Sequence, residues 1–489
     1  LRLPPMAIRI YDTLARDQVE LATREPDRVA MYVCGPTVWN FIHIGNARTF
    51  LWFDFIHLYL EYRGYDVTLV MNYTDVDDRI IERANFEKIP TEGITKKYEA
   101  AFEADMQALG SQPPDILTRA SQHISEMISA IEGLVANGSA YEVGGNVWFA
   151  VESFDGYGKL SGRTLDDMRA GEERVEPHES KRNPLDFSLW KAAKEGEPAW
   201  DSPWGPGRPG WHIECSVMST KYLGMGFDVH GGAVDLIFPH HENEIAQAEA
   251  LTGEAPFVRH WLHAAHVLME AEKMSKSLGN VVLARDAIEN FPPEAVRYWA
   301  LMGSYRSQVI FSETTLQDAS QAYDRWKTFF TSARHALGND MPAAADFPRR
   351  PVDDSGDPPS SYVARFVEAM DDDFNSAVAF AAIHDLVREG NKLLEAVQTG
   401  DDAAREELVE LVGSFLELTT VLGLHFSEAS TDTELVGGLI GYLLELRDRA
   451  REEKAFERAD QIRERLTELG VIVEDTPAGP RWRVGSGAS

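Results

Sequence analysis

The sequence predicts an α/β protein built around a Rossmann-type parallel sheet, which is followed by a helical region. The compact apolar run Val29–Val33 is typical of a buried strand, and a helical pattern follows from Ala47 to Tyr62. A second strand pattern at Asp66–Met71 completes a strand–loop–helix–strand unit, the building block of such sheets. Beyond residue 361, apolar positions recur every three or four residues, which favours packed helices.

The length of 489 residues requires several domains, because single hydrophobic cores stop growing near ~250–300 residues. A stretch rich in Pro, Asp and Ala separates the sheet region from the helical region and is typical of a linker. We expect a first half-sheet, a connective insertion, a second half-sheet, a linker, a helical bundle and a small mixed α/β cap, at residues 1–85, 86–203, 204–340, 341–361, 362–430 and 431–489.

The acidic balance of the chain is unusual. Lys and Arg number 47 against 79 Asp and Glu, which gives a net charge of −32 spread over the whole sequence. Long-range repulsion of this kind disfavours a polyanionic partner at low salt. In molar salt the Debye length falls to about 3 Å, so distant carboxylates are screened while contact pairs survive. We therefore predict a halophilic protein from a salt-rich cytoplasm.

Neither a membrane nor a secreted location is indicated. No apolar run approaches ~18 residues, and no basic-then-apolar leader opens the sequence. The two cysteines are far apart and make no disulfide framework. A cytoplasmic enzyme is the expectation.

Those two cysteines, Cys34 and Cys215, are candidate ligands of a soft metal ion. Proline is favoured in the first turn of a helix, so Pro239 predicts a helix that opens at His240. His240 and Glu244 are four apart and share one helix face. Two thiolates, an imidazole and a carboxylate make a plausible tetrahedral zinc shell. The alternative is that the cysteines are small buried apolar residues and the His-Glu run is a solvated helix start.

Two further segments indicate nucleotide binding. His43-Ile44-Gly45-Asn46 lies between the first strand and the long helix, where phosphates meet a helix N-terminus. Residues 272–280 carry Lys273 and Lys276 among serines, and such a cationic loop can close over a triphosphate. Taken alone, a pair of lysines in a loop is more often a solvated surface turn.

Together these motifs resemble the class I aminoacyl-tRNA synthetases, and within them the cysteinyl-tRNA synthetase family. His-Ile-Gly-Asn at 43–46 is similar to the HIGH signature, with Asn46 in place of its last histidine, and an asparagine amide can still donate. The order of motifs matches throughout: the sequence reads Cys-Gly-Pro-Thr at 34–37, Trp-His-Ile-Glu-Cys-Ser at 211–216, Phe-Pro-His-His-Glu-Asn-Glu at 238–244 and Lys-Met-Ser-Lys-Ser at 273–277.

The resemblance implies roles for individual residues. It implies a zinc ion that binds the substrate thiolate, and Mg²⁺ that accompanies ATP. The zinc ligands would be Cys34, Cys215, His240 and Glu244; the catalytic residues His43, Lys273 and Lys276; the ATP-binding residues His43, Gly45, Asn46, Gly231, Gly232 and Lys276; the cysteine-binding residues Thr74, Trp211 and Asp235. Trp211 as a core aromatic and Asp235 as a helix cap are the alternatives.

The resemblance also implies an anticodon-reading region at the C-terminal end. Its candidate contacts are Arg451, Phe456, Asp460 and Asp475, which otherwise look like an ordinary charged helix and turn. The implied partners are tRNA(Cys), L-cysteine and ATP, and the implied state is a monomer.

The implied activity is cysteine–tRNA ligation through cysteinyl-adenylate, with zinc selecting a thiol over the serine hydroxyl that shape alone rejects weakly. Two alternatives remain. A related ligase would pass cysteinyl-adenylate to a small-molecule amine, but such an acceptor needs no C-terminal anticodon reader. A non-enzymatic zinc-binding interaction protein would have no need of the lysine loop at 273–277.

Overall fold

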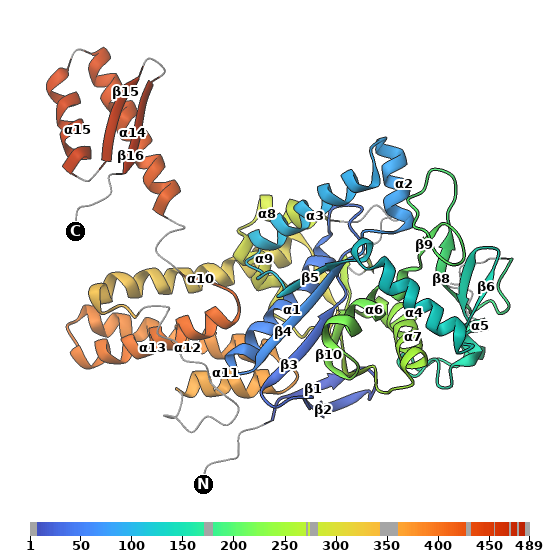
Figure 1. Ribbon diagram of the computed structural model, residues 1–489. Coiled ribbons are helices and arrows are strands. Elements are labelled where there is room, and N and C mark those ends of the chain that lie inside the picture. The colour runs from blue at the N-terminus through green and yellow to red at the C-terminus, as the bar shows by residue number, and fades with distance from the viewer. Residues whose placement is uncertain are drawn as a thin grey trace, which may run out of the picture. The chain divides into compact units, whose positions relative to one another are not determined.

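The computed structural model describes residues 7–170, 179–269, 272–273, 282–342, 360–426, 432–453, 455–468, 471–476 and 479–484. The chain divides into two compact units, one up to residue 425 and one from residue 426 onward (Figure 1). Among the described residues, no helix is both long and apolar enough to cross a lipid bilayer.

A five-stranded parallel sheet lies at the centre of the first unit and confirms the predicted α/β class. Its strand order is β11 (Val258–Ala264), β10 (Phe227–Ala233), β3 (Arg28–Val33), β4 (Asp66–Tyr73) and β5 (Ile116–Arg119). Helix α1 (Ile44–Tyr62) connects β3 to β4 as expected from the apolar pattern. Aromatic and aliphatic side chains occupy all its faces, and it is buried against the sheet and the helices that cover it.

The segment predicted as a connective insertion differs in part from that prediction. Strand β5 lies within it and extends the central sheet next to β4, with α2 (Asp78–Glu87) and α3 (Thr91–Ala108) between them in sequence. A separate antiparallel sheet follows, in the order β6 (Ala140–Val143), β7 (Asn146–Phe149), β8 (Phe187–Ala192) and β9 (Gly207–Pro209). β5 is short and carries Thr and Arg, so periodicity alone does not reveal it.

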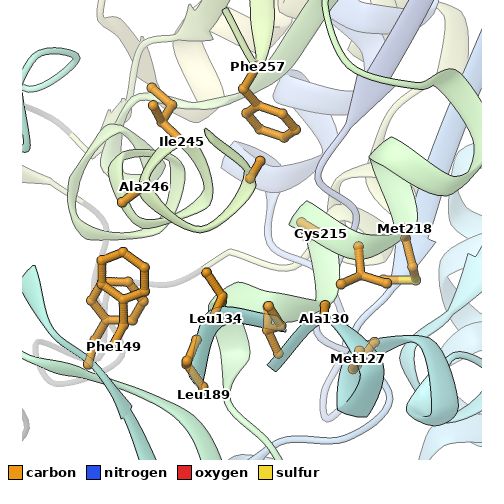
Figure 2. Packing of buried hydrophobic residues seen from close by; sticks show 14 of the residues in the cluster. Met127, Ala130, Leu134, Phe149, Leu189, Cys215, Met218, Ile245, Ala246 and Phe257 are labelled. Carbon is orange, nitrogen blue, oxygen red and sulfur yellow. The ribbon is translucent and has the colours of Figure 1, made fainter. Parts of the chain in front are cut away.

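The antiparallel sheet packs on three helices and shares one hydrophobic core with them. The helices are α4 (Ile124–Ala136), α6 (Trp211–Leu223) and α7 (Glu242–Thr252). Figure 2 shows this core, with Cys215 and Met218 on α6, Leu134 on α4 and Phe149 from the sheet. Cys215 is therefore fixed by packing on one side before it contributes to any site.

Short elements surround the sheet. They are the hairpin β1 (Arg9–Asp12) with β2 (Asp17–Glu20), helix α5 (Leu165–Ala170), the strands β12 (Val267–Met269), β13 (Glu272–Lys273) and β14 (Val309–Phe311), and the helices α8 (Ala284–Asn290) and α9 (Pro293–Leu301). The apolar run Ala264–Met269 predicts one strand, but it spans the last residue of β11 and all of β12, because the chain turns at residues 265–266 to leave the parallel sheet for a smaller one.

The helical bundle belongs to the same compact unit. It comprises α10 (Glu313–Leu337), α11 (Ser361–Asp371), α12 (Ser376–Gln398) and α13 (Asp402–Val421). Buried polar contacts join it to the sheet region. Arg63 pairs with Asp371 of α11, and Arg297 of α9, which forms an ion pair with Asp54 of α1 at 2.5 Å, also donates to the Leu422 carbonyl at 2.6 Å. Such buried pairs are less screened by salt than surface pairs are.

The second unit is a small mixed α/β body. Helices α14 (Asp432–Glu452) and α15 (Phe456–Glu468) pack with the hairpin β15 (Val471–Thr476) and β16 (Gly479–Val484) around a core of Ile440, Leu444, Leu466 and Val471. The sequence predicts one helical run over 435–469; the structure instead has two helices, of which α14 ends at Glu452 and α15 begins at Phe456. The strand-bearing tail is as predicted.

Candidate active site

The candidate site lies where the parallel strands end. Cys34 follows β3, Thr74 follows β4 and Asp235 follows β10, so the carboxyl edge of the sheet gathers them. A cavity of about 380 Å³ opens there. Of the residues predicted from sequence, it is lined by Cys34, His43, Asn46, Thr74, Trp211, Cys215, Asp235 and His240.

The four predicted metal ligands meet beside this cavity: Cys34, Cys215 and His240 line it, and Glu244 is completely buried. The Sγ atoms of Cys34 and Cys215 are 3.6 Å apart, and Cys34 Sγ is 3.6 Å from Glu244 Oε1. His240 Nε2 is 3.0 Å from Glu244 Oε1. The four donor atoms all lie within 4.8 Å of one another. His240 sits in a π-helical turn at Ile237–His241, immediately before α7 begins, and still shares a face with Glu244.

Burial controls the charge of this cluster. It raises the pKa of Cys34, Cys215 and Glu244 and lowers the pKa of His240, so each group favours its neutral form in the protein alone. Glu244 Oε2 is buried and has no hydrogen-bond partner among the described residues. A divalent cation would reverse the preference of the two thiols and of the carboxyl group, because it stabilises thiolate and carboxylate, and it would bind the imidazole of His240 in its neutral form. Two sulfurs, one nitrogen and one oxygen are a donor set that fits a thiophilic metal ion.

Two histidines of the cluster are not predicted from the sequence. His230 Nε2 is 3.5 Å from Cys34 Sγ, and His241 Nε2 is 3.3 Å from it. Together with Cys34 and Glu244 they form a second group of donor atoms within 4.8 Å. The pairing of β10 with β3 could have indicated His230. This histidine lies beside Tyr32 of β3, and Cys34 directly follows β3, so His230 comes close to Cys34.

Asn72 is a further unpredicted member of the site. Its Oδ1 accepts a hydrogen bond from the Gly35 amide at 3.0 Å, and its Nδ2 donates to Thr74 Oγ1 at 3.2 Å. A Cβ atom on Gly35 would lie 1.7 Å from the Asn72 carbonyl oxygen, so this position requires glycine. Asn72 thereby fixes the loop after Cys34 against the end of β4.

Trp211 and Asp235 lie at the mouth of the site. The Trp211 ring stacks on the His240 ring with centroids 4.2 Å apart, and it lines the cavity instead of being fully buried in a core. Asp235 is exposed and lies inside a short 3₁₀ turn at Val234–Leu236. Both also line a second cavity of about 490 Å³, toward the antiparallel sheet.

His43 and Asn46 form a capping box at the start of α1. His43 Nδ1 accepts from the Asn46 amide at 3.1 Å, and Asn46 Oδ1 accepts from the His43 amide at 3.4 Å. This geometry explains how asparagine is accommodated at position 46: its oxygen serves the helix while its Nδ2 group remains a donor.

Replacing Asn46 with alanine is expected to lower the free energy of unfolding by about 0.5–2 kcal/mol, because one half of the capping box is lost. Thr315 offers a matched control, since it forms the same box with Ser312 at the start of α10. Denaturant unfolding should show similar losses for Asn46→Ala and Thr315→Ala. A raised KM for ATP in Asn46→Ala alone would assign position 46 a second role; equal KM values would leave it a structural residue.

Packing also restricts the three glycines predicted to bind ATP. A Cβ atom would lie 2.1 Å from the Phe53 ring at Gly231, 2.8 Å from His241 at Gly232 and 3.0 Å from His43 at Gly45. None of the three is among the described residues that line the 380 Å³ cavity. Their ATP contacts stay a prediction.

The lysine loop is only partly described. Lys273 lies in β13, whose backbone pairs with β12, and Lys276 lies outside the described residues. The chain that follows returns to the site: the Ile44 amide donates to the Val282 carbonyl, and the Ala284 amide donates to the Ile42 carbonyl, both at 3.0 Å. The segment after the lysine loop is therefore hydrogen-bonded to the segment that carries His43.

The candidate anticodon residues all lie in the second unit. Arg451 is in the last turn of α14, and Phe456 and Asp460 are in α15, with exposed side chains; Phe456 is 62% exposed. Asp475 is in β15. Exposure of an aromatic side chain suits base stacking, but nothing in the described part of the unit identifies its ligand.

Comparison with known proteins defines the class. Residues 20–321 match the family of tRNA synthetases class I (C) catalytic domains, and residues 365–427 match the DALR domain. The fold is similar to methionyl-tRNA synthetase of Mycobacterium tuberculosis (16% identity, 81% of this chain and 89% of that one, TM-score 0.56). It is also similar to LeuRS of Agrobacterium radiobacter K84 (12% identity, 83% of this chain and 84% of that one, TM-score 0.56). The fold and the catalytic-domain match define a class I aminoacyl-tRNA synthetase.

The remaining matches narrow the class. Residues 441–483 match the cysteinyl-tRNA ligase anticodon binding domain. Cysteine–tRNA ligases of Pelotomaculum thermopropionicum and Brevibacillus brevis are 48% and 46% identical, over 97% and 98% of this chain and 99% and 100% of those proteins. The chain therefore belongs to the cysteine–tRNA ligase family, as its motifs predict.

Proposed function

We propose that this chain activates L-cysteine with ATP to cysteinyl-adenylate and transfers the cysteinyl group to the 3′ end of tRNA(Cys). The observation that carries the proposal is a thiol-seeking donor cluster in the wall of the same cavity that holds His43 and the start of α1. An amino acid with a thiol and a nucleotide can thus meet in one site. Membership of the cysteine–tRNA ligase family supports the same substrates.

In this proposal Cys34, Cys215, His240 and Glu244 hold one zinc ion. When bound, zinc supplies a coordination position that takes the substrate thiolate and leaves a serine hydroxyl a poor neutral ligand. That selection exceeds what a pocket shape could achieve between two side chains that differ by one atom.

The other cavity residues position the substrates. Thr74 and Trp211 line the cysteine pocket, and the carboxylate of Asp235 receives the substrate ammonium. The cysteine carboxylate is already ionised and attacks the α-phosphate in line, so no side chain need act as a base. His43, Lys273 and Lys276 stabilise the charge on ATP, which Mg²⁺ accompanies, and pyrophosphate leaves. Backbone near Gly45, Asn46, Gly231 and Gly232 contacts ATP.

The second unit reads the anticodon in this proposal, with Arg451, Phe456, Asp460 and Asp475 as contacts. The protein works as a monomer in the cytoplasm. The match of residues 441–483 to the anticodon-domain family supports the assignment of the unit, and the exposed side chain of Phe456 supports base stacking.

Charging of total tRNA with labelled cysteine or serine, in molar KCl with ATP and Mg²⁺, tests the proposal. We expect cysteine to be charged and serine not. Cysteine-dependent pyrophosphate exchange without any tRNA charging would retain the active site but contradict the acceptor, and would favour transfer to a small-molecule amine. Absence of both reactions would overturn the proposal.

The acidic composition supports a proposal of its own, that the protein works at high salt. Raising KCl from about 0.1 to 1 M shortens the Debye length from ~10 to ~3 Å, which removes the self-repulsion of the −32 charge. We expect the midpoint of thermal unfolding to rise over this range. An uncharged osmolyte at equal osmolality is the control, because it cannot screen charge. Maximal stability at low salt would contradict the proposal.

A further inference from the structure

His212 touches the candidate metal cluster from outside. It is the second residue of α6, and its Nδ1 lies 2.9 Å from Nδ1 of His240. The other ring nitrogen of His240, Nε2, is the one that lies 3.0 Å from Glu244 and belongs to the donor cluster. His240 is thus held at both ends of its ring, by the cluster on one side and by His212 on the other.

We propose that His212 is a positioning residue that fixes the orientation and the tautomer of His240. This inference rests on the zinc site proposed above. His212 is not a ligand: neither group of donor atoms that could hold an ion includes it, within the described part of the chain. Its effect on the ion passes through His240 alone.

The two rings allow only one arrangement of protons. A neutral imidazole carries one N–H and one acceptor nitrogen. A metal ion on Nε2 of His240 uses the lone pair there, so the proton of His240 must be on Nδ1. That N–H donates to Nδ1 of His212, which must accept, and His212 therefore carries its own proton on Nε2. The contact makes His240 a better ligand, because an accepting partner raises the basicity of the coordinating nitrogen.

Packing holds the His212 ring in place for this contact. The Phe187 ring meets it edge-on with centroids 5.5 Å apart, and Trp211 stacks on the His240 ring. The next residue in the chain makes a similar contact between two histidines: His241 Nδ1 is 2.8 Å from Nε2 of His263. Adjacent histidines of the cluster thus each have a second histidine on their outer nitrogen. For His212 the accepting nitrogen matters, and the rest of the ring lines the second cavity of about 490 Å³.

Two substitutions of the same shape separate hydrogen bonding from packing. His212→Asn keeps an acceptor, because Oδ1 of asparagine stands close to where Nδ1 of histidine lies. His212→Leu has the same size and branching as asparagine but no acceptor. The full-length chain would be stripped of metal and titrated with zinc against a chromophoric chelator. We expect His212→Leu to bind zinc about 10–100-fold more weakly and His212→Asn to remain close to the unchanged protein.

A second readout does not depend on affinity or activity. With Co²⁺ in place of zinc, the visible absorption reports the strength of the ligand field, and it should shift in His212→Leu but not in His212→Asn. Equal zinc affinities and equal spectra for all three proteins would overturn the inference alone, as would equal losses in both variants. An unchanged protein that takes up no zinc or cobalt would overturn the proposed metal site and the inference with it.

Discussion

Replacing Cys215 with serine is expected to remove the metal ion and with it the activation of cysteine. Cys215 is 1% exposed, and its sulfur lies 3.6 Å from that of Cys34, so serine fits sterically but offers a neutral hydroxyl in place of a thiolate. We expect zinc affinity to fall by more than about 100-fold, beyond the cost of losing an outer partner of a ligand. Metal analysis of the purified protein and cysteine-dependent pyrophosphate exchange measure the two losses.

The control for this variant lies one turn further along the same helix. Ser219 is completely buried in α6, and its hydroxyl donates to the Ser216 carbonyl of the same helix. The Ser219→Ala protein should therefore keep its zinc and its exchange activity, with a free energy of unfolding similar to that of Cys215→Ser. Full zinc content in Cys215→Ser would contradict the proposed ligand set, whatever the activity. Loss of exchange with zinc retained would instead assign Cys215 to substrate binding.

The framework of the fold follows from local sequence signals. The strand–helix–strand unit predicted from residue 29 to residue 71 is β3, α1 and β4. Apolar residues run through each of these elements, and a capping box marks the start of α1. β5 and the break between β11 and β12 have no such pattern, because pairing with neighbouring strands decides them.

Some residues of the candidate site can be predicted from local sequence, and others cannot. Residue type and one helical spacing predict Cys34, Cys215, His240 and Glu244 as a cluster, and the structure brings their donor atoms together. His230, His241 and Asn72 could not be found in this way. The places of His230 and Asn72 depend on the lateral order of strands, and no spacing in the sequence relates His241 to Cys34.

At position 46 the sequence shows the residue but not its structural role. The sequence shows only an asparagine where the resemblance predicts a histidine. The reciprocal capping of His43 and Asn46 becomes visible once α1 is known to begin at Ile44. A spacing of three residues before an apolar run is a capping-box pattern, but the pattern is usually sought with Ser or Thr at its start. Capping therefore gives this residue a structural role beside its predicted contact with ATP.

Replacing Lys276 with alanine is expected to lower the rate of adenylate formation by about 10²–10³-fold, the range typical of losing one donor to transition-state charge. The affinity for cysteine should barely change, because its proposed partners lie elsewhere, at the metal cluster and at Thr74, Trp211 and Asp235. Single-turnover formation of adenylate and equilibrium titration with cysteine separate the two quantities.

Two companion variants sharpen this experiment. Lys276→Arg keeps the charge and should recover part of the rate, since a guanidinium also donates to phosphate oxygens. Lys96→Ala removes a lysine that forms an exposed pair with Glu92, so it controls for a change of net charge in this acidic protein. A large loss of cysteine affinity in Lys276→Ala would contradict a role confined to ATP. Equally lowered rates for Lys276→Ala and Lys96→Ala would show that the change of net charge, and not a specific contact with the phosphates, causes the loss.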